Sequence, residues 1–134
     1  MKYLLDTNIC IYIIKKKPAR VIEQFKINKP GDIAISSISI SELNFGVKKS
    51  SEPEINKIAL VEFLQPLIVM DYTKEDADSY GKIRAELEKK GTPIGAMDLL
   101  IASQAINRGL ILVTNNESEF KRVKGIKIEN WTRG

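Results

Sequence analysis

The 134-residue sequence predicts a three-layer α/β/α domain around a mostly parallel central sheet of four to five strands. Short apolar runs alternate along the chain with longer amphipathic segments, as strands alternate with helices in such a fold. The run LILV at residues 110–113 is continuously apolar, which is typical of a parallel strand that is buried on both faces. No repeat, low-complexity tract or polar linker interrupts the chain, so residues 1–134 are predicted to form a single domain.

The first half of the chain carries a start or stop signal for most of its predicted elements. Asp6, Thr7 and Asn8 end the first strand and are favourable residues for beginning a helix. Pro18 and Pro53 each suit the first turn of a helix, where a missing N–H leaves no intrahelical bond unmade. The predicted elements are a strand at 2–5, helices at 9–15 and 18–27, a strand at 33–36, a helix from Ser39 or Ser41 to 49, and a helix from 53 with an apolar stripe of Ile55, Ile58, Ala59, Phe63 and Leu67.

In the second half of the chain, capping residues mark where the predicted helices begin and end. Thr73 is predicted to cap a long helix that Gly91 closes, and Gly109 closes the most apolar helix of the chain. The predicted elements are a strand at 67–70, helices at 73–90 and 98–107, and strands at 110–113 and 126–128.

Composition excludes several classes of enzyme. Histidine is absent and Cys10 is the only cysteine, so Ser-His-Asp and Cys-His nucleophile systems and cysteine-based zinc sites are excluded. Cys10 lies in an apolar run and is predicted to be a core residue. The apolar N-terminus is broken by polar residues and lacks a signal-peptide cleavage site, so we expect a cytoplasmic protein with no membrane segment.

Three acids, Asp6, Glu42 and Asp98, are the candidates for chemistry. Asp6 falls at the carboxyl end of a predicted strand, the edge where open parallel sheets bind ligands. Each acid also has a structural alternative. Asp6 can begin a helix, Asp98 can cap a helix or lie in its first turn, and Glu42 can form a capping box with Ser39. The functional interpretation is that the three carboxylates meet in one crevice.

Carboxylates that meet need a cation to remain ionised, because each raises the pKa of the others. Mg²⁺ suits an all-oxygen site and retains several waters. We therefore expect Asp6, Asp98 and Glu42 to be metal ligands and a metal-activated water to attack an RNA phosphodiester. This is the main hydrolytic route open to a chain without histidine.

Basic residues gather in two clusters that suit the phosphates of RNA, although a solvated surface is the alternative. The net charge is +4. The candidate RNA-binding residues are Lys15, Lys16, Lys17 and Arg20 in the first cluster and Lys121 and Arg122 in the second.

Several segments together resemble the PIN-domain toxins of the VapC family, and within it the tRNA(fMet)-specific endonucleases. They are LLDTNICIYIIKKKP, ISSISISELNFGV, IRAEL through GTPIGAMDLLIA to RGLILVTNNESEF, and IENW, which together cover essentially the whole chain. The resemblance implies a PIN-domain fold, a Mg²⁺ or Mn²⁺ site, cleavage of single-stranded RNA and a homodimer. It also implies a VapB-like antitoxin that wraps the toxin and blocks the acidic pocket. In the subgroup the substrate is initiator tRNA, cut in the anticodon stem-loop, which inhibits translation.

The family pattern has a fourth acid just after the fourth strand, where this chain has Asn115 and Asn116. Glu119 is the best match, and we expect it to support the site by holding a metal-bound water or a neighbouring polar group. Thr114 is expected to hold the carboxylate of Asp6. The residues expected to support the acids are Thr7, Asn8, Thr114, Asn115 and Asn116.

Three alternatives remain at this point. A haloacid-dehalogenase-like phosphatase normally has a second Asp where this chain has Asn8, and a response-regulator receiver needs an acidic pair that Asp6 lacks. A catalytically dead PIN-like RNA-binding module would retain the fold without the activity. Metal-dependent cleavage of RNA separates these classes.

Overall fold

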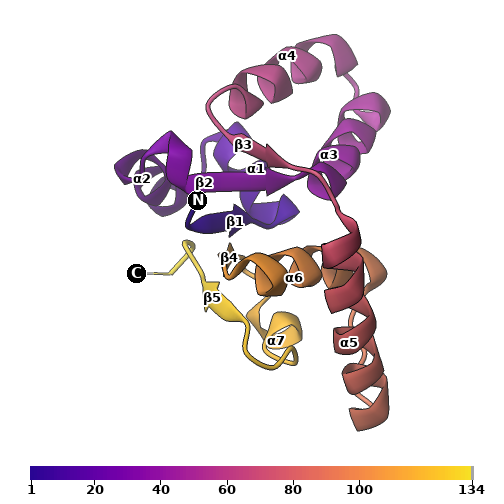
Figure 1. Ribbon diagram of the computed structural model, residues 1–134. Coiled ribbons are helices and arrows are strands. Elements are labelled where there is room, and N and C mark those ends of the chain that lie inside the picture. Colours follow the sequence, from indigo (N-terminus) through magenta and orange to yellow (C-terminus); the bar gives the residue numbers. More distant parts are fainter. Residues whose placement is uncertain (134) are drawn as a thin grey trace.

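The computed structural model describes residues 1–133 and contains a five-stranded sheet in the order β3–β2–β1–β4–β5 (Figure 1). Each pair of neighbouring strands is parallel. The strands are β1 (Tyr3–Leu5), β2 (Ile33–Ser36), β3 (Ile68–Met70), β4 (Ile111–Val113) and β5 (Lys127–Glu129). The predicted α/β architecture is confirmed, with five strands and only parallel pairing.

Helices connect the strands and cover both faces of the sheet. They are α1 (Thr7–Lys15), α2 (Ala19–Ile27), α3 (Ser37–Lys49), α4 (Pro53–Leu64), α5 (Lys74–Lys90), α6 (Ala96–Arg108) and α7 (Glu117–Phe120), with a 3₁₀ turn at Pro30–Asp32. Within residues 1–133, no helix combines the length and the apolar composition that a membrane span requires.

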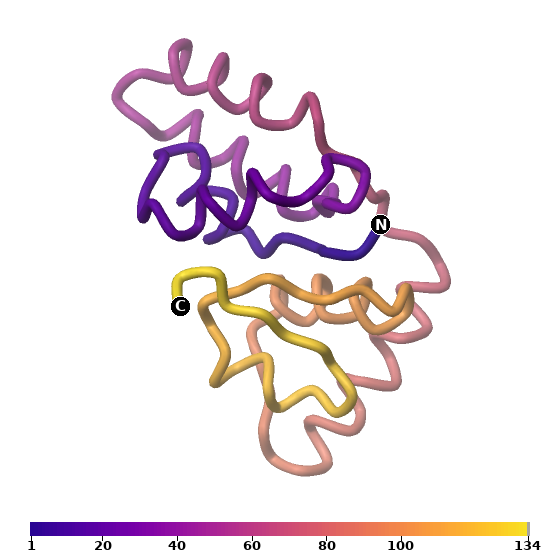
Figure 2. Tube along the Cα trace, turned by 90° about the vertical axis from the view of Figure 1, so that its left-hand side faces the viewer, coloured from indigo at the N-terminus to yellow at the C-terminus, as the bar shows by residue number. Residues whose placement is uncertain are grey.

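The two faces of the sheet carry separate cores because side chains of a strand alternate between faces. Tyr3 and Leu5 of β1 pack with α1 to α4, whereas Leu4 packs with α5, α6 and α7. Figure 2 shows the same division, with the indigo-to-magenta half of the chain above the orange-to-yellow half. The sheet therefore joins two halves, and its carboxyl edge collects residues from both.

Three sequence predictions about element limits or faces are wrong. Ser36, rather than Ser39 or Ser41, caps α3, because its hydroxyl accepts from the N–H of Ile38 at 3.0 Å. Helix α6 begins at Ala96, two residues before the predicted start at Asp98, so Asp98 is an acid of the first turn, which was one of the two structural alternatives for it. On α4, Ile55 and Ile58 are each 61% exposed, since Leu60 and Phe63 form the buried face.

The buried carboxylate of Asp76 connects α5 to α6 through hydrogen bonds. Asp76 completes a capping box at the start of α5, where its Oδ2 accepts from the N–H of Thr73 at 2.9 Å. The same fully buried side chain accepts from Arg108 at 2.9 Å and from Asn107 at 2.8 Å. These bonds hold the C-terminal end of α6, the helix that carries Asp98 at its other end.

Candidate active site

Asp6 directly follows β1, the central strand, and is the N-cap residue of α1. Asp6 is only 5% exposed, and both of its carboxylate oxygens are hydrogen-bonded. Oδ1 accepts from the N–H of Thr7 and Oδ2 from the hydroxyl of Thr114, each at 2.9 Å. Burial raises the pKa of Asp6, while these two bonds stabilise the ionised form and oppose the rise. Asp6 is therefore held in one orientation at the carboxyl end of the sheet.

Glu42 lies inside α3 and is linked to Asp6 through Thr7. The hydroxyl of Thr7 donates to Oε1 of Glu42 at 2.6 Å and also hydrogen-bonds the buried hydroxyl of Ser39 at 3.1 Å. The capping box considered for Ser39 and Glu42 is wrong, because Ser36 caps the helix. Thr7 thus connects two acids, through its backbone to one and through its side chain to the other.

Asp98 is the third residue of α6 after the N-cap Gly95, and its side chain is half-buried. Burial and the adjacent Glu119 carboxylate raise the pKa of Asp98 to about 7, and the charges of Asp6 and Glu42 add to the rise. Asp98 therefore lies near enough to the other three carboxylates for their charges to disfavour its ionisation.

Glu119, on α7, lies beside Asp98 and holds the loop before α6. Its Oε1 accepts from the N–H of Gly95 at 2.6 Å, and its Oε2 accepts from Nδ2 of Asn116 at 2.6 Å. The bond from Gly95 is the main cause that lowers the pKa of Glu119. A Cβ at Gly95 would lie 3.5 Å from Oε1 of Glu119 and 3.6 Å from Oδ2 of Asp98. Both carboxylates therefore flank this glycine.

The asparagines expected to support the acids have different neighbours. Asn116 holds Glu119, whereas Nδ2 of Asn115 donates to the hydroxyl of Tyr12 on α1 at 2.8 Å. Oδ1 of Asn115 is buried and has no hydrogen-bond partner within residues 1–133. Asn8 is exposed on the first turn of α1, where its side chain makes no hydrogen bond to the described part of the chain.

The chemistry of this site fits a hard divalent cation. Its donors are oxygen atoms only, and burial together with mutual repulsion opposes ionisation of Asp6 and Asp98. Among residues 1–133, no three acidic or sulfur ligands are already spaced to hold an ion between them. Mg²⁺ commonly takes only one or two protein carboxylates and keeps water as its remaining ligands, so a closed cage is not required.

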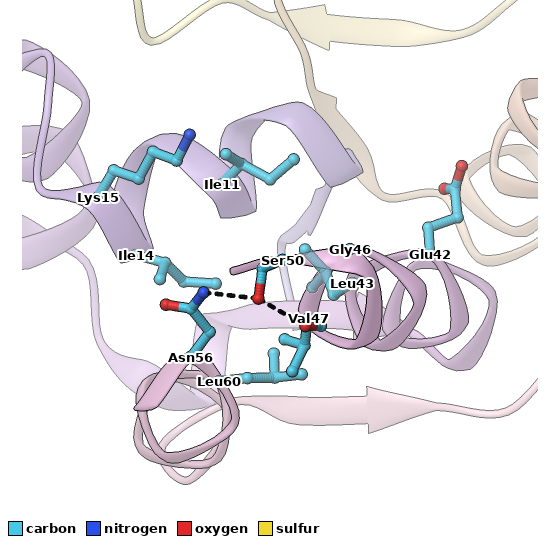
Figure 3. A pocket seen from close by; sticks show the side chains of 10 residues that line it. All are labelled: Ile11, Ile14, Lys15, Glu42, Leu43, Gly46, Val47, Ser50, Asn56 and Leu60. Atoms are coloured by element: carbon cyan, nitrogen blue, oxygen red, sulfur yellow. Dashed lines mark hydrogen bonds between the residues drawn. The ribbon is translucent and has the colours of Figure 1, made fainter. Parts of the chain in front are cut away.

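A groove of about 320 Å³ runs between α1, α3 and α4 (Figure 3). Glu42 lies at one end of the view and Lys15 at the other, with Ser50 and Asn56 hydrogen-bonded at 2.9 Å between them. The apolar lining consists of Ile11, Ile14, Leu43, Val47 and Leu60. The groove therefore connects an acid of the site with the first basic cluster.

The candidate RNA-binding residues differ in their contacts. Lys15, Lys16, Lys17 and Arg20 are exposed around the end of α1 and the start of α2. In the second cluster, Lys121 lies 3.9 Å from the carboxylate of Glu117. Arg122 donates to the carbonyl oxygen of Pro93 at 2.7 Å, in the loop before α6.

Sequence reasoning missed three residues that organise the site. The N–H of Gly95 donates to Glu119, and the hydroxyl of Tyr12 accepts from Asn115. Ser39 hydrogen-bonds the hydroxyl of Thr7 instead of capping α3. A signal existed only for Ser39, which precedes Glu42 by one helical turn. The other two contacts join residues far apart in sequence and leave no local pattern.

Comparison with known proteins relates the whole chain to one family. The family model described as the PIN domain matches residues 3–126. The chain is 47% identical over 132 residues to the tRNA(fMet)-specific endonuclease VapC of Shigella flexneri, covering 98% of this chain and 99% of that one. It is 46% identical over 134 residues to ribonuclease VapC2 of Rickettsia felis, covering 99% and 100%.

Solved structures agree with this relationship. A DNA-bound VapBC from Salmonella typhimurium matches with a TM-score of 0.93 and 47% identity, covering 98% of each chain. VapBC2 from Rickettsia felis, bound to a DNA fragment from its promoter, matches with a TM-score of 0.92 and 45% identity, covering 98% of this chain and 99% of that one.

Proposed function

Because the chain belongs to the PIN-domain family, we propose that it is a metal-dependent endoribonuclease and the toxin of a type II toxin–antitoxin pair. Its substrate on this proposal is initiator tRNA, cut in the anticodon stem-loop, so that translation stops. Nearly full-length identity of 47% to a tRNA(fMet)-specific endonuclease supports the substrate. The observation that carries the activity is the linkage of Asp6 and Glu42 through Thr7, together with the Asp98 and Glu119 carboxylates beside Gly95, in a chain without histidine.

Three of the acids are the proposed metal ligands, and neighbouring groups orient two of them. Asp6, Asp98 and Glu42 would hold Mg²⁺, with Mn²⁺ as the alternative ion. When bound, such an ion lowers the pKa of a coordinated water and neutralises charge on the phosphate. Thr114 and the N–H of Thr7 orient Asp6, while the hydroxyl of Thr7 orients Glu42. Burial and the adjacent Glu119 carboxylate raise the pKa of Asp98 to about 7, and a bound cation would favour its ionised form.

The basic residues beside the site would hold the RNA backbone. Lys15 reaches the groove that begins at Glu42, and Lys16, Lys17 and Arg20 extend the positive charge along the surface. Phosphates bound there would place a neighbouring phosphodiester near the acids. Each such contact on single-stranded RNA adds about 0.7 to the slope of log affinity against log salt.

A VapB-like antitoxin is the proposed partner. The structural neighbours at 45% and 47% identity are VapBC assemblies, which supports a bound antitoxin. The apolar groove between α1, α3 and α4 would accept an apolar segment of this partner, and a basic side chain at its end would pair with the acids. The homodimer expected from the resemblance remains part of the proposal.

Incubation of the purified protein with total RNA, in Mg²⁺ or in EDTA, tests the activity, and mapping of the cut ends tests the substrate. We expect cleavage only with the metal, at a single position in initiator tRNA. RNA binding without cleavage would favour a binding module, and turnover of a small phosphate ester instead of RNA would favour a phosphatase. Growth arrest on expression, relieved by a co-expressed antitoxin, tests the toxin role.

A further inference from the structure

Helix α6 begins without a side-chain cap of its own. Its N-cap residue is Gly95, and the first backbone N–H groups of any helix lack intrahelical partners. In a capping box, the acid at the third helical position accepts from the N–H of the N-cap residue. Asp98 occupies that third position, so Gly95 would be its ordinary partner.

Glu119 takes this partner instead. Its Oε1 accepts from the N–H of Gly95 at 2.6 Å, across 24 residues of sequence. Asn116 donates to the other carboxylate oxygen at 2.6 Å and so fixes the orientation of Glu119. The Asp98 carboxyl group therefore does not accept from the N–H of Gly95 and lies beside the Glu119 carboxylate instead.

Arg122 holds the same loop from the other side. Arg122 lies three residues after Glu119, beyond the end of α7, and its guanidinium donates to the carbonyl oxygen of Pro93 at 2.7 Å. Pro93 lies two residues before Gly95, so Glu119 and Arg122 fix both ends of the short segment that leads into α6.

We propose that Glu119 and Arg122 cap the start of α6 from outside the helix, so that the N–H of Gly95 does not engage the Asp98 carboxyl group. Both are positioning residues, and Asn116 assists Glu119. The consequence for RNA cleavage rests on the proposed function, whereas the consequence for α6 does not.

Amide hydrogen exchange of Gly95 in the metal-free, RNA-free protein tests the cap itself. Glu119→Ala removes the acceptor, and we expect exchange at Gly95 to rise about tenfold, as loss of a hydrogen bond to a charged group implies. Glu119→Gln keeps an acceptor for Gly95, and Asn116 can turn its amide to match, so exchange should stay within about threefold of wild type. Unchanged exchange at Gly95 in Glu119→Ala would overturn the proposal.

Arg122→Ala supplies a second test that leaves Glu119 in place and serves also if Glu119→Ala does not fold. We expect exchange at Gly95 to rise about threefold and kcat to fall about fivefold, with KM and the salt dependence of RNA binding unchanged. Lys124→Ala is the charge-matched control, because Lys124 is exposed in the same segment, whereas the bond to the carbonyl oxygen of Pro93 comes from Arg122. It should change none of these quantities.

A raised KM and a salt slope lower by about 0.7, with unchanged exchange at Gly95, would make Arg122 a phosphate contact and overturn its positioning role. If the wild-type protein cleaves no RNA, the proposed function fails. The exchange measurements still decide whether Glu119 and Arg122 cap α6.

Discussion

Asp76 and Asp98 occupy the same position in two neighbouring helices, the third residue of α5 and the third residue of α6. Asp76 caps its own helix and pairs with Arg108, and these bonds lower its pKa to about 2. Asp98 has no such donors, and burial beside other carboxylates raises its pKa to about 7. The position in the helix is the same, but the carboxyl groups titrate in opposite directions.

The difference lies in which group accepts from the N-cap amide. In α5 the N–H of Thr73 is bonded to Asp76, whereas in α6 the N–H of Gly95 is bonded to Glu119. When an acid at this position caps its own helix, its carboxylate is occupied by hydrogen bonds within the fold. When a residue outside the helix accepts from the N-cap amide instead, as Glu119 does in α6, the carboxylate of the acid can bind a ligand.

The largest expected difference between the two aspartates is in catalysis. Asp98→Asn keeps the shape but removes a charged ligand, so we expect RNA cleavage in Mg²⁺ to fall by about a thousandfold or more. Asp76→Asn, assayed well below its melting temperature, should cleave close to the wild-type rate. Cleavage rates on initiator tRNA measure both variants, and equal losses would remove the distinction between a structural and a functional aspartate.

The two substitutions should differ in their effect on the stability of the metal-free protein. Asp76→Asn leaves Arg108 without its buried partner and weakens the capping box, so we expect a loss of about 2–3 kcal/mol. Asp98→Asn removes a charge that its neighbours repel and should leave the stability unchanged or raise it. Urea denaturation at pH 7.5 gives both values. A marked loss of stability in Asp98→Asn would indicate that Asp98 has a structural role.

Stability should also depend on pH in two separate windows. Burial and the neighbouring carboxylates raise the pKa of Asp98 in the folded protein from its ordinary value of about 4 to about 7, so the folded state binds the proton more tightly. This contribution lowers stability as pH rises from about 4 to 7. The pKa of Asp76 is lowered to about 2, so its stabilisation is present above about pH 4 and is lost as pH falls toward 2. In denaturation curves across pH, Asp98→Asn should flatten the upper window and Asp76→Asn the lower one, and the reverse assignment would be inconsistent with these pKa shifts.

A smaller effect is expected at Asp6, where the protein supplies donors that Asp98 lacks. Thr114→Val is nearly isosteric but removes the buried hydroxyl that donates to Oδ2 of Asp6. We expect metal affinity to weaken about 10- to 100-fold, as for other groups that orient a ligand. Thr114→Ser, which keeps the hydroxyl, is the control. An unaltered metal titration in Thr114→Val would limit Thr114 to a structural role at the end of β4.

Sequence patterns located much of this arrangement because the signals are local. A strand followed by Asp6, and an apolar run followed by Thr114, predict two polar strand ends at one edge of a parallel sheet. The cap of α6 was not predictable, because Gly95 and Glu119 meet only after the chain has passed through a helix and a strand. The limits of α3 were missed because several serines in succession offer equally good caps, and only packing selects Ser36.

The central claim is that Asp98 has a raised pKa and ionises when it binds a cation, and proton release on metal binding tests this most directly. Calorimetric titration of the wild-type protein with Mg²⁺, in two buffers of different ionisation enthalpy, counts the protons. With a pKa of about 7, Asp98 should release about half a proton per site at pH 7 and almost none at pH 9, and Asp76→Asn should behave like the wild type. Metal binding with no proton release at pH 7 would contradict the account.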